Sequence, residues 1–320
     1  MTRYLVRRLA LYFPTLILAS LGIFGIMRVI PGDVAMVILG GETSTPAALA
    51  QADALRERLG LLDSLPVQYF RWVWSMVNGE FGGTSLVSRE PISEILARRL
   101  PVTLELAAWT ALIAWVVSIP AGVLAAVYQN RTPDYAVRFV TLAGTALPNF
   151  WIALMLILAL LVWFSWTPPI FYVKIWNDPW MHMQKMIWPA LILAWGYSSY
   201  LTRVTRSTML EVLRQDYVRT ARSRGLVERI VVAGHALPNA LIPVVTLGGL
   251  QLATLFSGTV VIEQVFSLPG VGQGVAQAAF ERDYPVIQSI VMLLVTLMLT
   301  LNVVIDVIYA KLDPRISYAR

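Results

Sequence analysis

The sequence predicts an all-α polytopic membrane protein with six transmembrane helices and an external domain between the first and second helices. Three observations lead to this fold class. Only 14% of the 320 residues are charged and 57% are hydrophobic, whereas a soluble domain carries about 25% charged residues. The hydrophobic residues form long blocks, and arginines gather at the ends of these blocks. The chain has no cysteine, which excludes disulfides and thiolate metal or redox sites.

Six apolar blocks are candidates for spans, because crossing about 30 Å of hydrocarbon takes about 20 helical residues. They run approximately over Leu9–Ile30, Val102–Tyr128, Phe139–Phe164, Met186–Leu201, Leu241–Val265 and Ile287–Ala310. The fourth block is short, but Trp188, Trp195 and Tyr200 suit a helix with aromatic anchors at the membrane interfaces. We expect helices throughout, because every lipid-exposed backbone group must be bonded within its own segment.

Positive charges predict the orientation, since short loops rich in Lys and Arg stay in the cytoplasm. If six spans alternate, one side receives the basic residues of the N-terminus, of the loop after the second span, of the loop after the fourth span and of the tail. These are Arg3, Arg7, Arg8, Arg131, Arg138, Arg203, Arg206, Arg214, Arg219, Arg222, Arg224, Arg229, Lys311, Arg315 and Arg320. The net charge of +6 is therefore interpreted as a topology signal, and both termini are expected to be cytoplasmic.

The chain is divided accordingly. Residues 1–30 form a cytoplasmic N-terminus and the first span, 31–100 an external loop domain, 101–310 a five-helix core with a cytoplasmic loop at 202–240, and 311–320 a cytoplasmic tail. The basic start and the apolar run behind it resemble a secretion signal. The run is too long for such a signal and lacks a small-x-small cleavage site, so we expect an uncleaved span.

The external domain is predicted to contain two helices. Pro46–Leu59 has Thr45 as a candidate N-cap and Gly60 as a candidate C-cap. The second stretch, Val67–Val77, is amphipathic and places Phe70, Trp74 and Val77 on one face. This domain is either a lid on the outer ends of the spans or a docking surface for an external protein, and the residues favour neither.

The cytoplasmic loop Thr202–Ala240 is predicted to contain an Arg-rich helix. Leu213, Tyr217 and Ala221 recur at i, i+4 and i+8, and Gly225 is placed to end the helix. The helix is either held at anionic headgroups or is a rigid knob that fits a groove in a cytosolic partner. The residues by themselves leave both interpretations open.

Ionisable residues near the span ends and one histidine are the remaining candidates for special chemistry. Arg28, Glu105, Glu263 and Asp306 lie within a turn or two of a span end, where we expect them to reach water by snorkelling. They form no row of buried acids, which argues against a proton-driven carrier. The run Met181–Met186 includes His182 and suggests either a soft-metal site or, more commonly, an interfacial stretch with a solvated histidine.

No lysine follows a glycine, so there is no Walker A phosphate loop, and neither histidine begins a His-Glu-x-x-His zinc site. We expect no cofactor, no metal and no catalytic residue in this chain. If its work uses ATP, another chain hydrolyses it. The run Gly270–Gly274 lacks the third glycine of a dinucleotide fingerprint, and a turn that re-enters or caps a pore mouth is the better interpretation.

The loop 216–240 resembles the cytoplasmic loop of ABC importer permeases. The pattern in that family is Glu-Ala-Ala-x-x-x-Gly followed, nine residues later, by Ile-x-Leu-Pro. Here Ala221, Gly225, Leu237 and Pro238 match, whereas Arg219, Thr220 and His235 depart from it. These departures resemble the dipeptide, oligopeptide and nickel branch, which commonly has Tyr-x-Arg-Thr-Ala-x-x-x-Gly and His-Ala-x-Pro-Asn.

The resemblance extends over nearly the whole chain. Segments similar to those of the branch are Arg28–Asp33, Gly79–Gly82 with Ser85, Thr103–Leu106, Val261–Glu263, Phe266–Gly270, Arg282–Pro285 and Leu312–Arg315. The chain is therefore similar to the permease with the large external loop, the dipeptide-permease B type. The resemblance implies the type I ABC importer permease fold and a bacterial or archaeal inner membrane.

The resemblance also implies a division of labour. An external solute-binding protein would deliver the solute, a second related permease would complete the pathway, and two ABC ATPases would use ATP and Mg²⁺; no nucleic acid is expected. It implies an ATPase-coupling loop of Asp216, Tyr217, Arg219, Ala221, Arg222, Gly225, His235, Leu237 and Pro238. It implies an outer gate of Glu263, Phe266, Pro269, Gly270, Asp283 and Tyr284, on a turn exposed at the pathway mouth.

Several questions stay open at this stage. A self-sufficient secondary carrier or channel is the alternative function. The solute is one of several classes, among them dipeptides, oligopeptides, glutathione, nickel chelates and opine-like compounds. In the coupling loop, a bulky charge at Ala221 is expected to block an ATPase groove while leaving the core intact. Arg222 is a candidate partner for an ATPase carboxylate.

Overall fold

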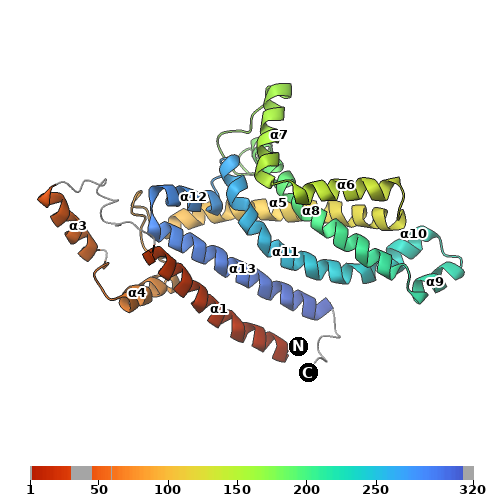
Figure 1. Cartoon of the computed structure of the whole chain (residues 1–320), viewed down its shortest axis with the longest axis horizontal. Coiled ribbons are helices and arrows are strands. Elements are labelled where there is room, and N and C mark those ends of the chain that lie inside the picture. Colours follow the sequence, from red (N-terminus) through yellow and green to blue (C-terminus); the bar gives the residue numbers. More distant parts are fainter. Residues whose placement is uncertain (1, 30–44, 59, 313–320) are drawn as a thin grey trace. The chain divides into compact units, whose positions relative to one another are not determined.

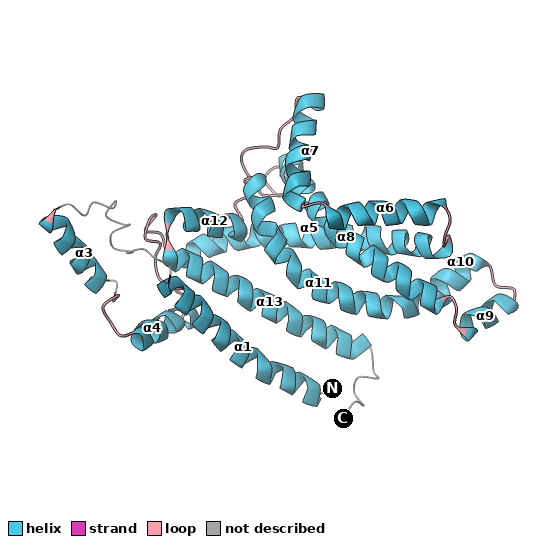
Figure 2. Cartoon of the chain, in the orientation of Figure 1, coloured by secondary structure: helices cyan, strands magenta, loops and turns pink. Residues whose placement is uncertain are grey.

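The computed structural model describes residues 2–29, 45–58 and 60–312 (Figure 1). Within this part the chain is helical without a β-strand, and Thr84 and Pro91 form one isolated bridge (Figure 2). The predictions for Pro31–Ser44 and for the tail Asp313–Arg320 lie outside the described residues. The all-α fold class is confirmed.

Thirteen helical elements are described. In chain order they are α1 (Thr2–Val29), α3 (Pro46–Arg58), α4 (Leu65–Val77), α5 (Ile92–Val127), α6 (Thr132–Ala146), α7 (Asn149–Phe164), α8 (Pro179–Val212), α9 (Asp216–Ser223), α10 (Glu228–Ile230), the π-helix η1 (Val231–Ala236), α11 (Leu237–Val265), α12 (Val271–Glu281) and α13 (Tyr284–Leu312). The two helices predicted for the external domain, Pro46–Leu59 and Val67–Val77, are confirmed as α3 and α4.

These helices fall into two compact units. Unit 1 comprises residues 1–4, 103–268 and 301–320, and unit 2 comprises residues 5–102 and 269–300. Helices α1, α5 and α13 contribute residues to both units. Each unit has a hydrophobic core of its own.

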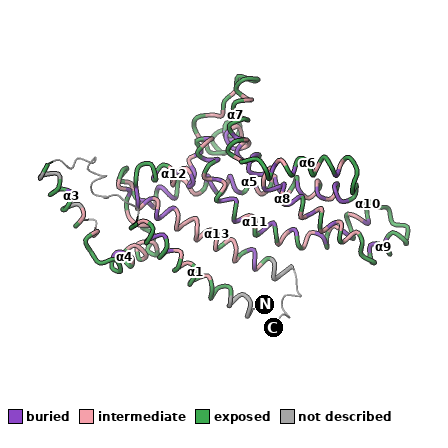
Figure 3. Tube along the Cα trace, viewed as in Figure 1, coloured by how far each residue is buried: buried purple, intermediate pink, exposed green. Residues whose placement is uncertain are grey.

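Helix α8 is the central helix of unit 1. It packs against α6 on one side and α11 on the other (Figure 1), and much of its middle is buried (Figure 3). Tyr197 and Leu201 of α8 join Val244 of α11 in one apolar cluster. A Cβ at Gly248 of α11 would lie 2.6 Å from the side chain of Leu201 and 2.8 Å from that of Trp115, so a larger residue would displace these side chains and weaken the close helix approach.

Unit 2 is built around the first turns of α5. Ile92 and Leu96 of α5 pack with Val271 of α12 and Ile290 of α13. Helix α4 is attached to α1 by a hydrogen bond of 2.7 Å between the hydroxyls of Tyr69 and Ser20. Residues 5–29 of α1 and 284–300 of α13 thus belong to one unit with α4 and the first turns of α5.

The third predicted span, Phe139–Phe164, is wrong as a single helix. It is broken into α6 and α7, which meet at an angle of 104°. The break falls at Leu147 and Pro148, which both have extended backbone angles. Proline has no N–H for the helical ladder and disfavours helical angles in the residue before it, so the chain turns here.

Among the described residues, four helices are long and apolar enough to cross a membrane, or five candidates if the bent pair α6 and α7 counts as one span. The helical stretches that meet this criterion are Arg8–Val29, Ile92–Val127, Glu228–Val265 and Tyr284–Ile308. Helix α8, the predicted fourth span, is not among them. Its position explains this, because a helix surrounded by α6 and α11 buries Ser198, Ser199, Thr202 and Thr205 against protein and need not be as apolar as one that faces lipid.

Candidate functional site

The loop between α8 and α11 forms a small folded knob in unit 1. Helix α8 ends at Val212, a turn follows, and α9 begins at Asp216. After a second turn at Gly225, the chain continues through α10 and η1 into α11. The π-helix η1 is an uncommon element that often accompanies functional sites.

One face of α9 packs on the body of unit 1. Val218 is 0% exposed and Ala221 is 7% exposed. They belong to an apolar cluster with Ala126 of α5, Met209 of α8, Val231 and Ala236 of η1, and Ala240 of α11. We call this set the loop core. Its members come from five helices, so α9 is fixed against the helices it connects.

The predicted register of this helix is wrong. The stripe of Leu213, Tyr217 and Ala221 assumes one continuous helix, whereas the turn between Val212 and Asp216 separates α8 from α9. Tyr217 is consequently 44% exposed, and Val218 takes the buried position beside Ala221. Ala221 therefore faces the chain's own core, and a role for its small size at an ATPase surface does not follow.

The opposite face of α9 is polar and exposed. Its residues are Asp216, Tyr217, Arg219, Thr220 and Ser223. Arg219 is 70% and Asp216 is 96% exposed by side chain, and their charged atoms lie 3.5 Å apart. The amide nitrogen of Asn239 donates to the hydroxyl of Tyr217 at 2.9 Å and to the carbonyl of His235 at 3.2 Å. These bonds connect the exposed face to η1 and to the first turn of α11.

Arg222 has its partner inside the loop. Its Nε and Nη2 donate to the two carboxylate oxygens of Glu228 at 3.1 and 2.7 Å. The bonds lower the pKa of Glu228 and raise the pKa of Arg222 relative to their ordinary values. This pair closes the turn between α9 and α10. The hypothesis that Arg222 pairs with a partner's carboxylate is therefore not needed to explain the residue.

Gly225 ends α9 as predicted. Its φ is +77° and its N–H donates to the carbonyl of Arg222 at 3.0 Å. A Cβ here would meet nothing within 4 Å, so the backbone angle is the only reason that glycine is required. Of the remaining predicted loop residues, His235 is exposed within η1, and Leu237 and Pro238 open α11.

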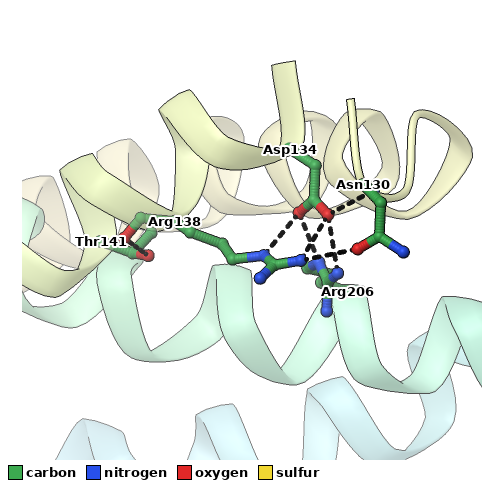
Figure 4. Close-up of polar contacts among 5 residues, drawn as sticks. All are labelled: Asn130, Asp134, Arg138, Thr141 and Arg206. Atoms are coloured by element: carbon green, nitrogen blue, oxygen red, sulfur yellow. Dashed lines mark hydrogen bonds and ion pairs between the residues drawn. The ribbon is translucent and has the colours of Figure 1, made fainter. Parts of the chain in front are cut away.

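An acidic node holds α6 to α8, and the sequence analysis did not identify it (Figure 4). Asp134 at the start of α6 is completely buried. Arg206 of α8 donates to its two oxygens at 2.7 and 2.8 Å, and Arg138 donates at 3.1 and 2.9 Å. The backbone N–H of Asn130 adds a fifth bond at 2.9 Å. The bonds from Arg206 and then Arg138 hold the pKa of Asp134 well below its usual range.

Two basic residues have a structural role in this node. Arg138 and Arg206 were assigned to topology alone, yet both neutralise one buried carboxylate. The node lies at the end of α8 that leads into the knob. It fixes α8, from which the loop projects, against α6.

The predicted outer-gate residues are distributed over both units. In unit 1, Glu263 is 0% and Phe266 is 2% exposed, and the hydroxyl of Thr103 donates to Glu263 at 2.7 Å. The expectation that Glu263 reaches water by snorkelling is therefore wrong. Asp306 is also buried, at 7% exposure.

In unit 2, the gate residues Pro269, Gly270, Asp283 and Tyr284 flank α12. Asp283 is 2% exposed and accepts a hydrogen bond from the hydroxyl of Ser85. Gly270 accepts a bond of 3.2 Å from Arg99 through its carbonyl. Gly270 is buried and is the N-cap of α12. The predicted exposed turn is thus mostly a packed helix start, in which Ser267 is exposed and has a φ of +49°.

His182 is buried inside unit 1 against Glu105, whose side chain is 27% exposed. The Nε2 of His182 lies 2.6 Å from a carboxylate oxygen of Glu105, and His182 is 0% exposed by side chain. The hydroxyl of Tyr172 donates to Glu105 at 3.0 Å; burial and then this carboxylate raise the pKa of Tyr172. The interpretation of a solvated His182 is wrong. Among the described residues, no group of three His, Cys, Asp or Glu side chains could hold a metal ion.

Comparison with known proteins gives matches over the whole chain. Residues 118–318 match the family model described as "Binding-protein-dependent transport system inner membrane component", and residues 1–107 match its N-terminal companion. An oligopeptide transport system permease protein, AppB of Bacillus subtilis, is 38% identical over 99% of this chain and 100% of its own length. The glutathione transport system permease protein GsiC of Salmonella paratyphi A is 39% identical, with the same coverage. A putative peptide transport system permease protein of Brucella suis is 37% identical, also over 99% and 100%.

Solved structures support the fold. The inward-facing MetNI methionine ABC transporter contains a chain that matches with a TM-score of 0.57 at 20% identity, covering 70% of this chain and 99% of that one. An amino acid ABC transporter matches with a TM-score of 0.52 at 15% identity, covering 68% and 94%. The architecture is therefore that of a type I ABC importer permease. The chain belongs to the family of binding-protein-dependent transport system inner membrane components, and it is a permease subunit of the ABC importer class.

Proposed function

We propose that this permease forms, together with a second related permease, the membrane pathway for peptides or a related small solute such as glutathione. The observation that carries the proposal is identity of 37% to 39% over the full chain to permeases named for oligopeptide, peptide and glutathione transport. An external binding protein delivers the solute, and two ABC ATPases use ATP and Mg²⁺. This chain binds no cofactor and has no catalytic residue.

We infer six crossings in the inner membrane with both termini in the cytoplasm. Four helices and the bent pair α6 and α7 supply five crossings, and the 34-residue α8 supplies the sixth. The arginine-rich knob and the node at Asp134 then lie in the cytoplasm, while residues 31–100 lie outside. The proposal keeps the domain limits predicted from the sequence, which are 1–30, 31–100, 101–310 and 311–320.

The topology is testable because the chain has no cysteine. Single cysteines at Ser223 and Ser64, both exposed, should react with a membrane-impermeant maleimide on opposite sides of the membrane. In intact cells or spheroplasts Ser64→Cys should be labelled and Ser223→Cys only after permeabilisation. The reverse pattern would invert the orientation.

In the coupling proposal, the exposed polar face of α9 docks in a groove of an ATPase. The loop core, the pair of Arg222 with Glu228 and the bond from Asn239 to Tyr217 make this face a rigid projection. Closure of the ATPases on ATP would then move the knob and the helices α8 and α11 that carry it. Such a movement is the physical requirement for converting ATP binding into a change of pathway state.

The function is tested by reconstitution. The chain should be placed in proteoliposomes with its partner permease, the ATPases and the binding protein, and uptake of labelled di- and tripeptides and of glutathione should be measured. We expect uptake that requires ATP and every component. Uptake by the chain alone, driven by an ion gradient, would instead support a self-sufficient secondary carrier.

Substitution of Gly225 should impair the loop through backbone strain. Gly225→Val is expected to destabilise the end of α9 by about 1–2 kcal/mol, because a β-branched residue rarely adopts positive φ. Gly225→Asn is the matched control, since asparagine tolerates this conformation. Hydrogen exchange of the loop and uptake by the full complex should be measured. Equal exchange and uptake in the two variants would remove the argument for a strained turn.

The pair of Arg222 with Glu228 predicts rescue within the chain. Arg222→Glu should loosen the loop, and the double variant Arg222→Glu with Glu228→Arg should restore it. The side chains are 40% and 53% exposed, so the expected change is about 1 kcal/mol or less. Loop protection by hydrogen exchange measures both variants. If only a charge reversal on the ATPase restores assembly, Arg222 is an intersubunit residue and the internal pair is incidental.

A further inference from the structure

Unit 2 contains a cleft to which the proposed function assigns no ligand. Two hollows lie along the same three helices, α1, α4 and α13. The first is a pocket of about 390 Å³ at the ends of the helices, bordered on α1 by Arg28 and on α13 by Tyr284 and Gln288. The second is a groove of about 280 Å³ bordered by Ser20 on α1 and by Met292 and Thr296 on α13. Trp72 of α4 borders both.

The pocket and the groove differ in chemistry. Along the pocket lie Arg28, Gln68, Arg71 and Glu80, whereas the groove is bordered mainly by Leu16, Ile17, Val73, Met76, Met292 and Leu293. The cleft is thus polar at the ends of α1 and α13 and apolar further along them. A molecule that fits it has a polar head and a hydrocarbon tail.

The charges of the pocket specify the head. Arg71 is paired with Asp63 at 2.8 Å. Arg28 and Glu80 have no ion-pair partner in the described parts of the chain, and Arg28 lies 5.1 Å from the centre of the Phe24 ring. One guanidinium and one carboxylate are therefore available in a single pocket. They complement a phosphate and a primary ammonium carried by one ligand.

Unpaired polar atoms in the pocket wall also indicate a ligand with a polar head. Gln68 is 8% and Gln288 is 9% exposed. The Oε1 of Gln68, the Nε2 of Gln288 and the Nε1 of Trp72 are buried and have no hydrogen-bond partner among the residues that the structure describes. Buried polar atoms are normally satisfied, so a polar head that reached these side chains would remove an unfavourable feature of the wall.

The depth of the groove distinguishes a lipid from a dissolved solute. Ser20, which bonds to Tyr69 of α4, lies nine residues before the end of α1 at Val29, or about 13 Å along the helix axis. Met292 lies eight residues after the start of α13 at Tyr284, or about 12 Å. Half of the hydrocarbon thickness of a bilayer is about 15 Å. The groove therefore runs through one leaflet, where acyl chains are found.

The outer face of α4 is consistent with this position. Phe70, Trp74 and Val77, at i, i+4 and i+7, are 69%, 67% and 73% exposed. Opposite them, Tyr69 and Trp72 pack against Phe24 of α1. An aromatic, apolar face at this depth along α1 suits the boundary between headgroups and acyl chains. An aqueous partner protein would have to enter the leaflet to cover it.

We propose that the cleft between α1, α4 and α13 binds an aminophospholipid of the phosphatidylethanolamine class, with its headgroup in the pocket and an acyl chain in the groove. The phosphate contacts Arg28 and the ammonium contacts Glu80. The depth of the groove in the membrane rests on the proposed crossings α1 and α13, and the choice of the outer leaflet rests on the proposed topology. The lipid attaches α4, in the middle of the proposed external domain 31–100, to the membrane.

The test uses the assembled transporter in nanodiscs that contain phosphatidylethanolamine with a diazirine in one acyl chain. After illumination, mass spectrometry should locate adducts in Leu65–Val77 and in the first three turns of α13. Arg28→Gln and Glu80→Gln should each reduce labelling about tenfold, the effect of losing a hydrogen bond to a charged group. Arg98→Gln and Glu94→Gln are matched controls in unit 2; Arg98 forms its ion pair with Glu90, and neither control residue borders the cleft.

Competitors separate the possible ligands. Excess phosphatidylethanolamine should displace the probe, whereas phosphatidylcholine, inorganic phosphate and a tripeptide should not. Displacement by the tripeptide would make the pocket a solute site, and equal displacement by phosphatidylcholine would remove the role of Glu80; either result overturns the proposal. It is also overturned if Phe70→Cys reacts with an impermeant maleimide and is protected by the binding protein, because α4 is then a protein-docking surface.

Discussion

Replacing Asp134 with alanine is expected to separate α6 from α8 and to destabilise unit 1 by about 3 kcal/mol. Removal of one partner from a buried ionic node leaves the remaining charges uncompensated, which costs about 3–5 kcal/mol. We take the lower end because Arg138 is 44% and Arg206 is 20% exposed by side chain, so water can solvate part of the freed charge. The measurement is thermal unfolding of the purified complex, followed by size-exclusion chromatography in detergent.

The pH dependence of this node follows from the lowered pKa of Asp134. A carboxylate whose pKa is lower in the folded state stabilises the fold at every pH above its unfolded pKa of about 3.9. That stabilisation is lost only as the pH falls through the lower, folded value. The difference in stability between the native chain and Asp134→Ala should therefore be constant from about pH 5 to 8.

Asp216→Asn is the matched control for Asp134→Ala. Asp216 also faces an arginine, Arg219, but its side chain is 96% exposed and the two charged atoms are 3.5 Å apart. An exposed pair of this kind contributes at most about 1 kcal/mol. If Asp134→Ala unfolds at the same temperature as Asp216→Asn, the node does not hold α6 to α8.

The second large effect is expected at Ala221. Ala221→Glu introduces a carboxylate into the loop core, where Val218 and Val231 are completely buried. Burial of an unpaired carboxylate is strongly unfavourable, so α9 should detach, at a cost of about 3 kcal/mol or more. Hydrogen exchange should rise throughout residues 213–236, and the ATPases should no longer co-purify. The six proposed crossings should persist, because the loop core lies at one end of α8 and α11.

Thr220→Glu separates a folding defect from a docking defect. Thr220 is the neighbouring residue, and it is exposed. The variant should keep the hydrogen exchange of the native loop, whatever it does to ATPase binding. Normal protection of the loop in Ala221→Glu would show that the loop core is not a packed unit. That result would support the expectation that a bulky charge at Ala221 blocks an ATPase groove and leaves the fold intact.

The fold class could be predicted from the sequence because it depends on local patterns. Long apolar blocks predicted four of the helices that are long and apolar enough to cross a membrane, and the pattern of Phe70, Trp74 and Val77 predicted α4 almost to the residue. Gly225 ended α9 as its position indicated. Each of these features is determined by residues that are close in sequence.

Features that depend on distant residues were missed. The bonds of Asp134 include one to Arg206, which is 72 positions away, and no local pattern indicates that pairing. The same holds for the bond between Thr103 and Glu263, which are 160 positions apart and without which Glu263 looked like a snorkelling residue. The break of the third span at Leu147 and Pro148 had a local signal in the proline, but the apolar run around it concealed the break.

The register of α9 was missed for a different reason. The turn between Val212 and Asp216 contains neither glycine nor proline, so the sequence pattern predicted one helix that continues through it. In the structure the turn rotates α9 so that Val218 and Ala221 reach the loop core. The coupling residues predicted from the family resemblance all lie in one knob. Which of them face the loop core and which face solvent could be seen only in the folded structure.

The exposed face of α9 is proposed as the surface on which an ATPase docks. Arg219→Cys places one thiol on that face, in a chain without any other cysteine. The rate of reaction with a water-soluble maleimide should be measured for the purified permease pair and for the pair assembled with the ATPases. Gln129→Cys, exposed on the short connection between α5 and α6, serves as the control on the same proposed side. We predict that assembly slows labelling of Arg219→Cys at least about tenfold and leaves Gln129→Cys unchanged; an unchanged rate at Arg219→Cys in a complex that retains its ATPases would contradict the claim.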